Sequence, residues 1–332
     1  MPKRKRIVTS LFSAWVMASI IVASAWAEPL AIEMTGSNSA LVKGRANFAI
    51  PAYHLNFVTS HQATAVASMS ARTRLALVIV GPDELLMRRL TEEAYADFRA
   101  QMTAVGLALL SDADAKGIAA EMERVPGNMD KSPPISGFTL GKSNRRGWVT
   151  FGPAVAPEMT AFSLSASAFG GIAGGEMNKP AGVLDAVVII PSLSIDFAST
   201  SASTGSNFLG RKTASVEGKV GFSVLAESAA IFQNPAGDTG FGTPGTIRLK
   251  GAVVSATTFA KVEEGGAAVN VGTMTSIADD NYQSVQRARG DAVIVDLPVW
   301  EGLVRDAYRS FNAAIVASVI SGRKKESACW FG

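Results

Sequence analysis

The chain has few side chains that commonly carry chemistry at neutral pH, and their spacing matches no familiar site. Its 332 residues contain two histidines, His54 and His61, and a single cysteine, Cys329. One cysteine permits neither an intramolecular disulfide nor a thiolate zinc site. The histidines are seven residues apart with no carboxylate near them in the sequence to complete a metal site. We therefore interpret one as a strand-face histidine and the other as a loop histidine.

Catalysis by a nucleophile finds equally little support. A serine hydrolase would need His54 or His61 as its base, and the sequence lacks the Gly-x-Ser-x-Gly elbow that presents a nucleophilic serine. Ser321 and Lys324 match a Ser-x-x-Lys pair by letter, but they stand at the predicted end of a helix, where a lysine stays solvated. The sequence predicts no catalytic residue.

Two short motifs suggest ligands but depart from the patterns that bind them. Gly141-Lys142-Ser143 has the letters that end a phosphate loop, yet Ser136 stands where that loop needs its first glycine. Together with Arg145 and Arg146, it predicts a basic surface turn. Asp279-Asp280-Asn281 lacks the spaced carboxylates of a calcium loop and predicts a capped turn. We predict no cofactor and no metal.

The N-terminus has the three zones of an export signal. Residues 3–6 are basic, residues 7–22 are uncharged, and Ala25-Trp26-Ala27 is a small-x-small cleavage site. We predict a cleavable signal peptide at 1–27 and a single domain at 28–332, located in the periplasm or secreted. An uncleaved anchor is the alternative, since residues 7–27 carry no charge and are long enough to span a bilayer.

Charge and composition describe a folded, nearly neutral mature protein. Hydrophobic residues make up 48% and charged residues 18%, which suits a chain with a buried core. The net charge of +3 includes four bases in residues 3–6, so the rest of the chain is close to neutral. We predict no nucleic-acid partner. A protein partner or self-association is the expected mode of interaction, and peripheral membrane association stays open.

The first half of the chain predicts strands and one clear helix. Residues 47–58 and 74–80 read as strands, with a long hairpin connection at 59–71 between them. Gly81-Pro82-Asp83-Glu84 starts a helix with an apolar stripe that ends at Gly106. A strand at 107–110 then completes a strand-helix-strand crossover with parallel strands, and a weaker helix runs to Val125. A solvated helix face is the interpretation of four acids, Asp83, Glu92, Glu93 and Asp97.

The second half predicts longer strands and a terminal helix. A Gly/Ser-rich excursion at about 126–182 reads as loop, and residues 183–197 and 214–225 read as strands with one dry and one wet face. Residues 198–213 read as a mobile linker. Residues 246–262 read as a further strand, with a break near Gly251 as the alternative, and 292–295 read as one more. A helix from Asp296 to Gly322 follows. The predicted fold class is α+β: a mixed, mostly antiparallel sheet with two main helices packed on one face.

Alternating stretches of about ten residues are also what a membrane-crossing β-hairpin requires. Residues 193–197 and 216–225 partly meet this requirement. Two strands cannot enclose a pore, so many subunits would each have to contribute a hairpin. We favour a half-buried sheet and keep a secretion or pore-forming assembly as the first alternative.

The segment LTEEAYADFRAQMTAVGLALLS at 90–111 resembles a pattern in uncharacterised exported proteins of proteobacteria. The order of elements also resembles the periplasmic α+β domain of the curli-secretion channel family. Members of that family are anchored by an N-terminal lipidated cysteine, which this chain lacks, so the resemblance assigns no functional residue. We predict an exported envelope protein of non-enzymatic binding or assembly type. An extracytoplasmic hydrolase without a recognisable motif is the second alternative.

Overall fold

A computed structural model describes residues 30–35, 47–68, 70–121, 141–155, 186–233, 245–264, 268–270 and 287–329. The predicted signal peptide at 1–27, the turn Asp279-Asp280-Asn281 and most of the 126–182 excursion lie outside these residues.

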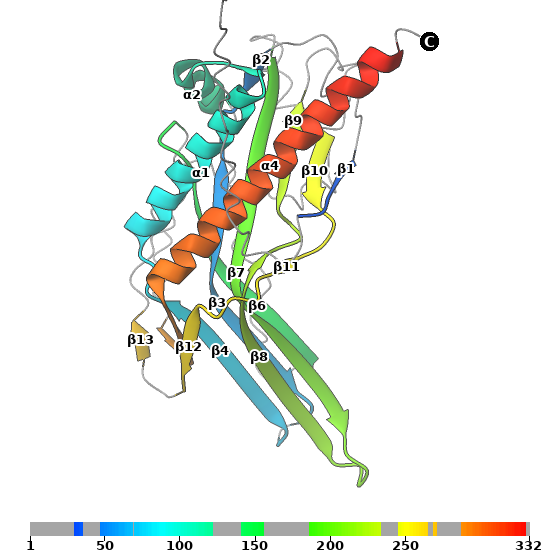
Figure 1. The fold of residues 1–332 in the computed structure, drawn as a ribbon. Helices are drawn as coiled ribbons and strands as arrows, with labels where there is room; N and C mark the ends of the chain where they lie inside the picture. Colours follow the sequence, from blue (N-terminus) through cyan, green and yellow to red (C-terminus); the bar gives the residue numbers. More distant parts are fainter. Residues whose placement is uncertain are drawn as a thin grey trace, which may run out of the picture.

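Two long helices lie on one face of a large mixed sheet (Figure 1). They are α1 (Glu84–Ala104) and α4 (Leu297–Cys329), with a short α2 (Asp112–Glu121) beside them. The main path of the sheet runs β1 (Ile32–Thr35), β10 (Gly245–Leu249), β9 (Ala229–Gln233), β7 (Ala186–Ser206), β3 (His54–Val66), β4 (Arg72–Val80), β15 (Asp291–Val295), β12 (Ala260–Glu263). Other strands pair beside this path: β2 (Asn47–Ala49), β5 (Ala108–Leu109), β6 (Gly141–Phe151), β8 (Lys212–Val224) and β11 (Val253–Val254). A separate pair is formed by β13 (Ala268–Asn270) and β14 (Arg287–Arg289). The α+β fold class, with a mostly antiparallel sheet and two main helices, is confirmed.

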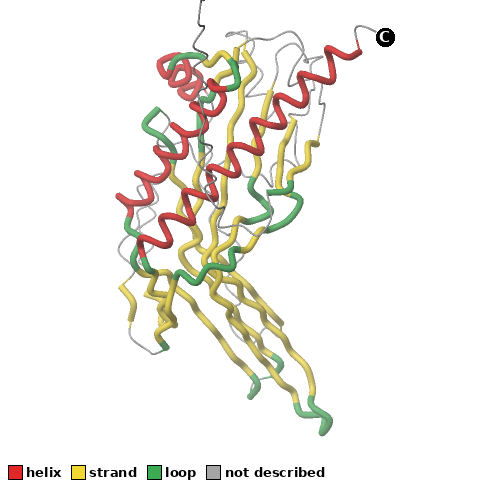
Figure 2. The backbone as a smooth tube through the Cα atoms, in the orientation of Figure 1, coloured by secondary structure: helices red, strands yellow, loops and turns green. Residues whose placement is uncertain are grey.

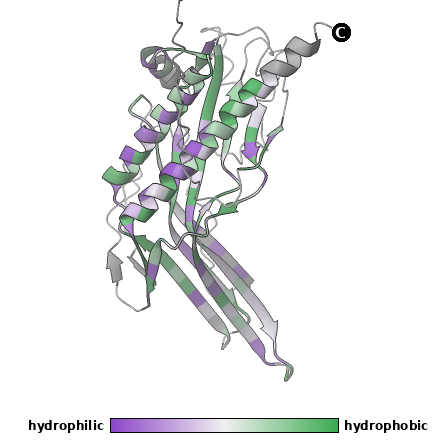
Figure 3. Ribbon diagram, in the orientation of Figure 1, coloured by the Kyte–Doolittle hydropathy of each residue, from purple (hydrophilic) through white to green (hydrophobic). Residues whose placement is uncertain are grey.

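The helices form where the sequence provides both a cap and an apolar stripe. Asp83 caps α1 by accepting a hydrogen bond from the Leu86 amide at 2.8 Å. Along α1 and α4, apolar residues recur at helical spacing and are buried. Figure 3 shows both helices as mixtures of hydrophobic and hydrophilic residues. The core members are Leu90, Ala94, Phe98 and Met102 of α1 and Trp300, Val304, Ala307, Phe311 and Ile315 of α4. Contrary to the prediction, Gly322 does not end α4, which continues to Cys329.

The polar face of α1 is not simply solvated, because α4 packs beside it. Glu93 accepts a hydrogen bond from Arg305 Nε at 2.8 Å, and Asp97 accepts one from Asn312 Nδ2 at 2.8 Å. Asn312 is fully buried and also accepts a hydrogen bond from the Tyr53 hydroxyl at 2.9 Å. The prediction of a solvated face is therefore wrong for Glu93 and Asp97, which join the two helices to each other and to the sheet.

Three predictions about the first strands are wrong. Pro51 separates β2 from β3 instead of lying inside one strand, as expected of a residue that cannot donate to a ladder. The predicted connection at 59–71 is mostly strand, since β3 continues to Val66 and a tight turn follows. The predicted crossover is also absent: β5 pairs with β2, and the parallel neighbour of β4 is β15.

The later segments contain more strand than predicted. The predicted linker at 198–213 belongs to the hairpin of β7 and β8. The two strands pair antiparallel, from Ile195 opposite Val224 to Ser206 opposite Lys212. The Gly/Ser-rich excursion contains β6, which pairs with β3 over its whole length. The strand predicted at 246–262 does break near Gly251, between β10 and β11, and it divides once more before β12.

Below the helices the sheet divides into two layers that project away from the body (Figures 1 and 2). We call this projection the β arm and define it as residues 60–68, 70–77, 141–147 and 198–220. One layer is the three-stranded ribbon β6-β3-β4, and the other is the β7–β8 hairpin. The layers touch closely at Gly218, where an added Cβ would lie 2.6 Å from Leu75 Cδ2 and 3.0 Å from Leu77 Cδ1.

The junction between β4 and α1 depends on the left-handed backbone of Gly81. Its φ is +127°, and a Cβ there would lie 2.8 Å from Val295 Cγ2. We expect Gly81→Ala to lower the free energy of unfolding by about 1–3 kcal/mol, measured by urea denaturation. The control is Gly302→Ala inside α4, where the space is open. It should raise stability by about 0.5–1 kcal/mol. Equal effects of the two substitutions would contradict this account.

The Glu93–Arg305 pair should make stability depend on pH. The hydrogen bond from Arg305 lowers the pKa of Glu93 below its usual 4.5. Stabilisation by a lowered pKa is present above the unfolded pKa and is lost as the pH falls through the folded pKa. Glu93→Gln should therefore cost up to about 1 kcal/mol at pH 7, because the pair is partly exposed, and less near pH 3. Denaturant titrations at both pH values test this. In an Arg305→Met background the pH-dependent difference should shrink, because Arg305 is the largest cause of the lowered pKa of Glu93.

Candidate functional site

The β arm begins where β7 leaves the side of β3. The parallel pairing of these strands ends at Phe57–Ile195, and from Ser60–Val78 onward β4 takes the same edge of β3. The ladders are irregular at this level on both sides: between Val58 and Ser60 of β3, and between Asp196 and Ala198 of β7. Bulges bend strands and increase their twist. The two irregularities thus turn one sheet into two layers at a point we call the fork.

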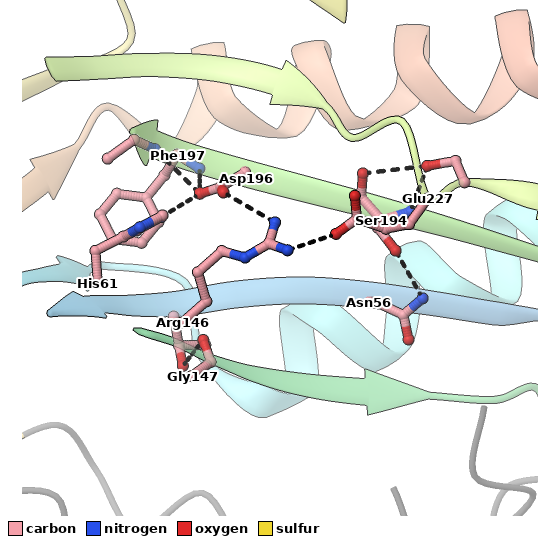
Figure 4. A network of polar contacts seen from close by, with 11 residues as sticks. Asn56, His61, Arg146, Gly147, Ser194, Asp196, Phe197 and Glu227 are labelled. Atoms are coloured by element: carbon pink, nitrogen blue, oxygen red, sulfur yellow. Dashed lines mark hydrogen bonds and ion pairs between the residues drawn. The ribbon is translucent and has the colours of Figure 1, made fainter. Parts of the chain in front are cut away.

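A buried carboxylate organises the fork (Figure 4). Asp196 Oδ1 accepts hydrogen bonds from the backbone amides of Phe197 at 2.7 Å and Ala198 at 3.2 Å, the residues of the bulge. The same oxygen lies 2.7 Å from His61 Nε2 on β3. The Asp196 and His61 side chains are only 3% and 5% exposed. One carboxylate therefore satisfies the irregular backbone of one layer and binds the other layer.

Arg146 extends this network to β6 and to the surface. Its guanidinium lies 3.9 Å from Asp196 Oδ2 and 2.9 Å from Glu227 Oε1. Glu227 belongs to the turn after β8, so Arg146 connects β6 to the β7–β8 hairpin through Asp196 and Glu227 (Figure 4). The arrangement joins segments that lie far apart in the sequence.

Just above the fork, Asn56 makes a second polar cluster. Its Nδ2 donates to Ser192 Oγ at 3.0 Å and Ser194 Oγ at 3.1 Å, and its Oδ1 accepts from Thr150 Oγ1 at 2.7 Å. These contacts hold β7 and β6 to the two edges of β3. Buried polar groups that are fully paired in this way specify one register among several.

The polar contacts at the fork serve attachment better than catalysis. The His61 ring packs edge-on against Phe197 with centroids 5.3 Å apart, so it is enclosed as well as hydrogen-bonded. A general base must reach a substrate proton, and this ring is almost inaccessible. In the part of the chain that the structure describes, no three His, Cys, Asp or Glu residues gather in a group that could hold a metal ion.

At the far end of the β arm, an ordered turn presents two apolar side chains. The Asn207 amide donates to the Arg211 carbonyl at 2.9 Å, and Asn207 Oδ1 accepts from the amides of Leu209 at 3.1 Å and Arg211 at 2.9 Å. Gly210 has a φ of +72°, which this turn requires. Phe208 is 95% exposed and Leu209 is 64% exposed. The turn is tightly bonded, yet it leaves a large apolar surface in water.

The arm is also strongly basic, although the chain as a whole is close to neutral. Its segments contain a single acid, Glu217. They contain eight bases: Arg72, Arg74, Lys142, Arg145, Arg146, Arg211, Lys212 and Lys219. Arg211 and Lys212 are exposed directly beside the apolar tip. The fold thus gathers charges that are scattered along the sequence into one projecting element.

The candidate residues from the sequence do not come together in one site. His54 and His61 both lie on β3 and are buried, so the prediction of a loop histidine is wrong. Seven residues of strand separate them by roughly 20 Å. Gly141-Lys142-Ser143 opens strand β6 and not a surface turn, so its backbone is extended. Ser321, Lys324 and Cys329 fall in the last turns of α4.

The sequence alone does not indicate which residues organise the arm. Alternation along the strand predicts a wet face for Ser194 and Asp196, yet both are buried, and their side chains contact Asn56 and His61 of β3. Asp196 and His61 are 135 residues apart. An acid inside a strongly apolar strand was the one local signal that could have drawn attention to it.

None of the described helices is long and apolar enough to cross a membrane. No family model, no curated protein and no solved structure matches this chain.

Replacing Asp196 tests whether the carboxylate holds the arm to the body. Asp196→Ala removes the acceptor of two bulge amides and the partner of His61, and we expect a loss of about 3 kcal/mol or more in unfolding free energy. Asp196→Asn keeps an acceptor oxygen and should lose less. Hydrogen exchange should show faster opening of residues 198–220 in the alanine variant. Glu263→Ala, at an exposed position of β12, should change stability by less than about 0.5 kcal/mol. Unchanged exchange in the arm would contradict this role.

Proposed function

We propose that the protein is an exported cell-envelope protein that acts by binding, not by catalysis, and that the β arm is its binding element. The observation that carries the proposal is the exposed pair Phe208 and Leu209, held by an ordered turn at the end of the arm. Exposed apolar groups on an ordered element are typical of interaction sites. The export signal expected at 1–27 supports the cellular location.

The division of the molecule supports the same proposal. The helix-covered body contains the large buried side chains, among them Trp300, Phe57 and Phe98, and forms a stable base. The arm presents little apolar surface except at its tip. A rigid base that positions a projecting recognition element is a common arrangement for binding proteins.

The alternatives receive less support from the same contacts. A hydrolase would need an accessible base, and His61 is enclosed between Asp196 and Phe197. A pore-forming subunit would have to free the apolar face of the β7–β8 hairpin. That face packs on β4 through Gly218, which lies against Leu75 and Leu77. Assembly into a pore would thus require the two layers of the arm to separate.

Site-specific cross-linking in cells tests the proposal. The photoreactive residue p-benzoylphenylalanine replaces Phe208 at the tip or, as the control, Leu85 of α1, which is an exposed apolar residue of the body at 77%. We expect adducts with an envelope component from position 208 and few from position 85. The mature N-terminus, read by mass spectrometry in the same samples, should be Glu28. Equal cross-linking at both positions would contradict the role of the arm, and an intact Met1 would contradict cleavage.

A further inference from the structure

We infer that the tip of the β arm docks on an anionic phospholipid surface. Phe208 and Leu209 enter the interface between headgroups and acyl chains, while Arg211 and Lys212 lie beside lipid phosphates. This inference rests on the proposed function, because it names the class of partner that the arm recognises.

The two apolar side chains at the tip are exposed to water, which costs free energy. A phenylalanine that is 95% exposed next to a leucine that is 64% exposed gains free energy when it leaves water. The turn is fixed by three hydrogen bonds of Asn207, through its amide and its Oδ1, so little conformational freedom remains to be lost on binding. Two apolar side chains on a narrow tip suit insertion into a soft interface better than a flat protein surface.

The positive charge of the arm favours a negatively charged lipid surface. Basic side chains near a membrane each gain about 1 kcal/mol from anionic lipids. Arg211, Lys212 and Lys219 are exposed on the β7–β8 hairpin, and Lys142 is exposed near the far end of the other layer. Glu217 is the one acid in the arm segments. A second copy of the chain would bring its own basic tip against this one, which disfavours self-association there.

The charge of the rest of the molecule orients the protein on such a surface. Outside the arm, the residues that the structure describes contain 18 acids and 14 bases, so the described body carries an excess of acids. An anionic surface therefore attracts the arm and repels the body. The arm projects away from both helices, so its tip can touch a surface while the body remains at a distance (Figure 1).

Vesicle sedimentation tests the inference with the exported protein. Vesicles of phosphatidylglycerol and phosphatidylcholine in equal parts should bind it, and pure phosphatidylcholine should bind it at least about tenfold more weakly. The double variant Phe208→Ser with Leu209→Ser should lose about tenfold or more in affinity. Arg211→Glu with Lys212→Glu should lose a similar factor, and added salt should weaken the wild type. The matched controls are Leu85→Ser and Lys250→Glu with Lys261→Glu, all exposed on the body, and they should bind like wild type.

Insertion is measured separately with an environment-sensitive dye. In a Cys329→Ser background, Phe208→Cys carries the label at the tip and Leu85→Cys carries it on the body. The tip label should brighten and shift to the blue with anionic vesicles, and the body label should not. Loss of binding only in the charge variant, with no dye response at the tip, would overturn insertion.

Two results would replace lipid by another partner. Tip-dependent dimers in sedimentation velocity without vesicle binding would assign the tip to a second copy. Protein adducts from position 208 in cells without vesicle binding would overturn the lipid inference and leave the arm as the binding element. Equal vesicle binding by the tip and control variants, together with equal cross-linking at 208 and 85, would overturn both.

Discussion

The shape of this protein depends on a buried carboxylate at the point where its sheet divides. Asp196 sits at an irregular step of β7, and its Oδ1 accepts hydrogen bonds from the two successive amides of Phe197 and Ala198. The contact between this oxygen and His61 then fixes the distance between the layers. A buried acid is costly unless it is paired and hydrogen-bonded, and here every partner belongs to the arm or to its base. This one side chain therefore contributes to both the direction and the attachment of the arm.

That attachment matters because the arm has little core of its own. In the body, aromatic side chains such as Trp300 and Phe57 fill the space between helices and sheet. Beside Leu75 and Leu77 of β4, the arm buries small residues: Ala63 and Ala65 of β3 are fully buried, and Gly218 lets the hairpin approach β4. Small side chains bury little apolar area. The rigidity of the arm thus comes from backbone ladders and from the polar contacts at the fork, and a thin, stiff element is the result.

The difference between large apolar residues in the body and small residues in the arm explains which elements could be predicted from the sequence. The stripe from Leu90 to Met102 and the stripe from Trp300 to Ile315 have the helical period and bury large residues, so both helices and the α+β class follow from local pattern. Residues 59–66 and 198–213 contain Ser, Thr, Ala and Gly with no strong period. Their strand structure is decided by partners distant in the chain, such as β6 for β3 and β8 for β7. Alternation predicts that Asp196 faces solvent, but it is buried against His61 of β3, a neighbour that the local pattern cannot reveal.

The net charge of the whole sequence can hide a charged binding surface that forms only on folding. Counted over the whole chain, 31 bases against 28 acids give no direction for a partner. Folding places Arg74, Lys142, Arg211 and Lys219 in one projection, although they come from three separate segments. Electrostatic potential depends on where charges lie, and clustered charge of one sign steers association with surfaces of the opposite sign. A nearly neutral protein can therefore present a strongly basic arm, with its exposed Phe208 and Leu209 at the end that would meet such a surface first.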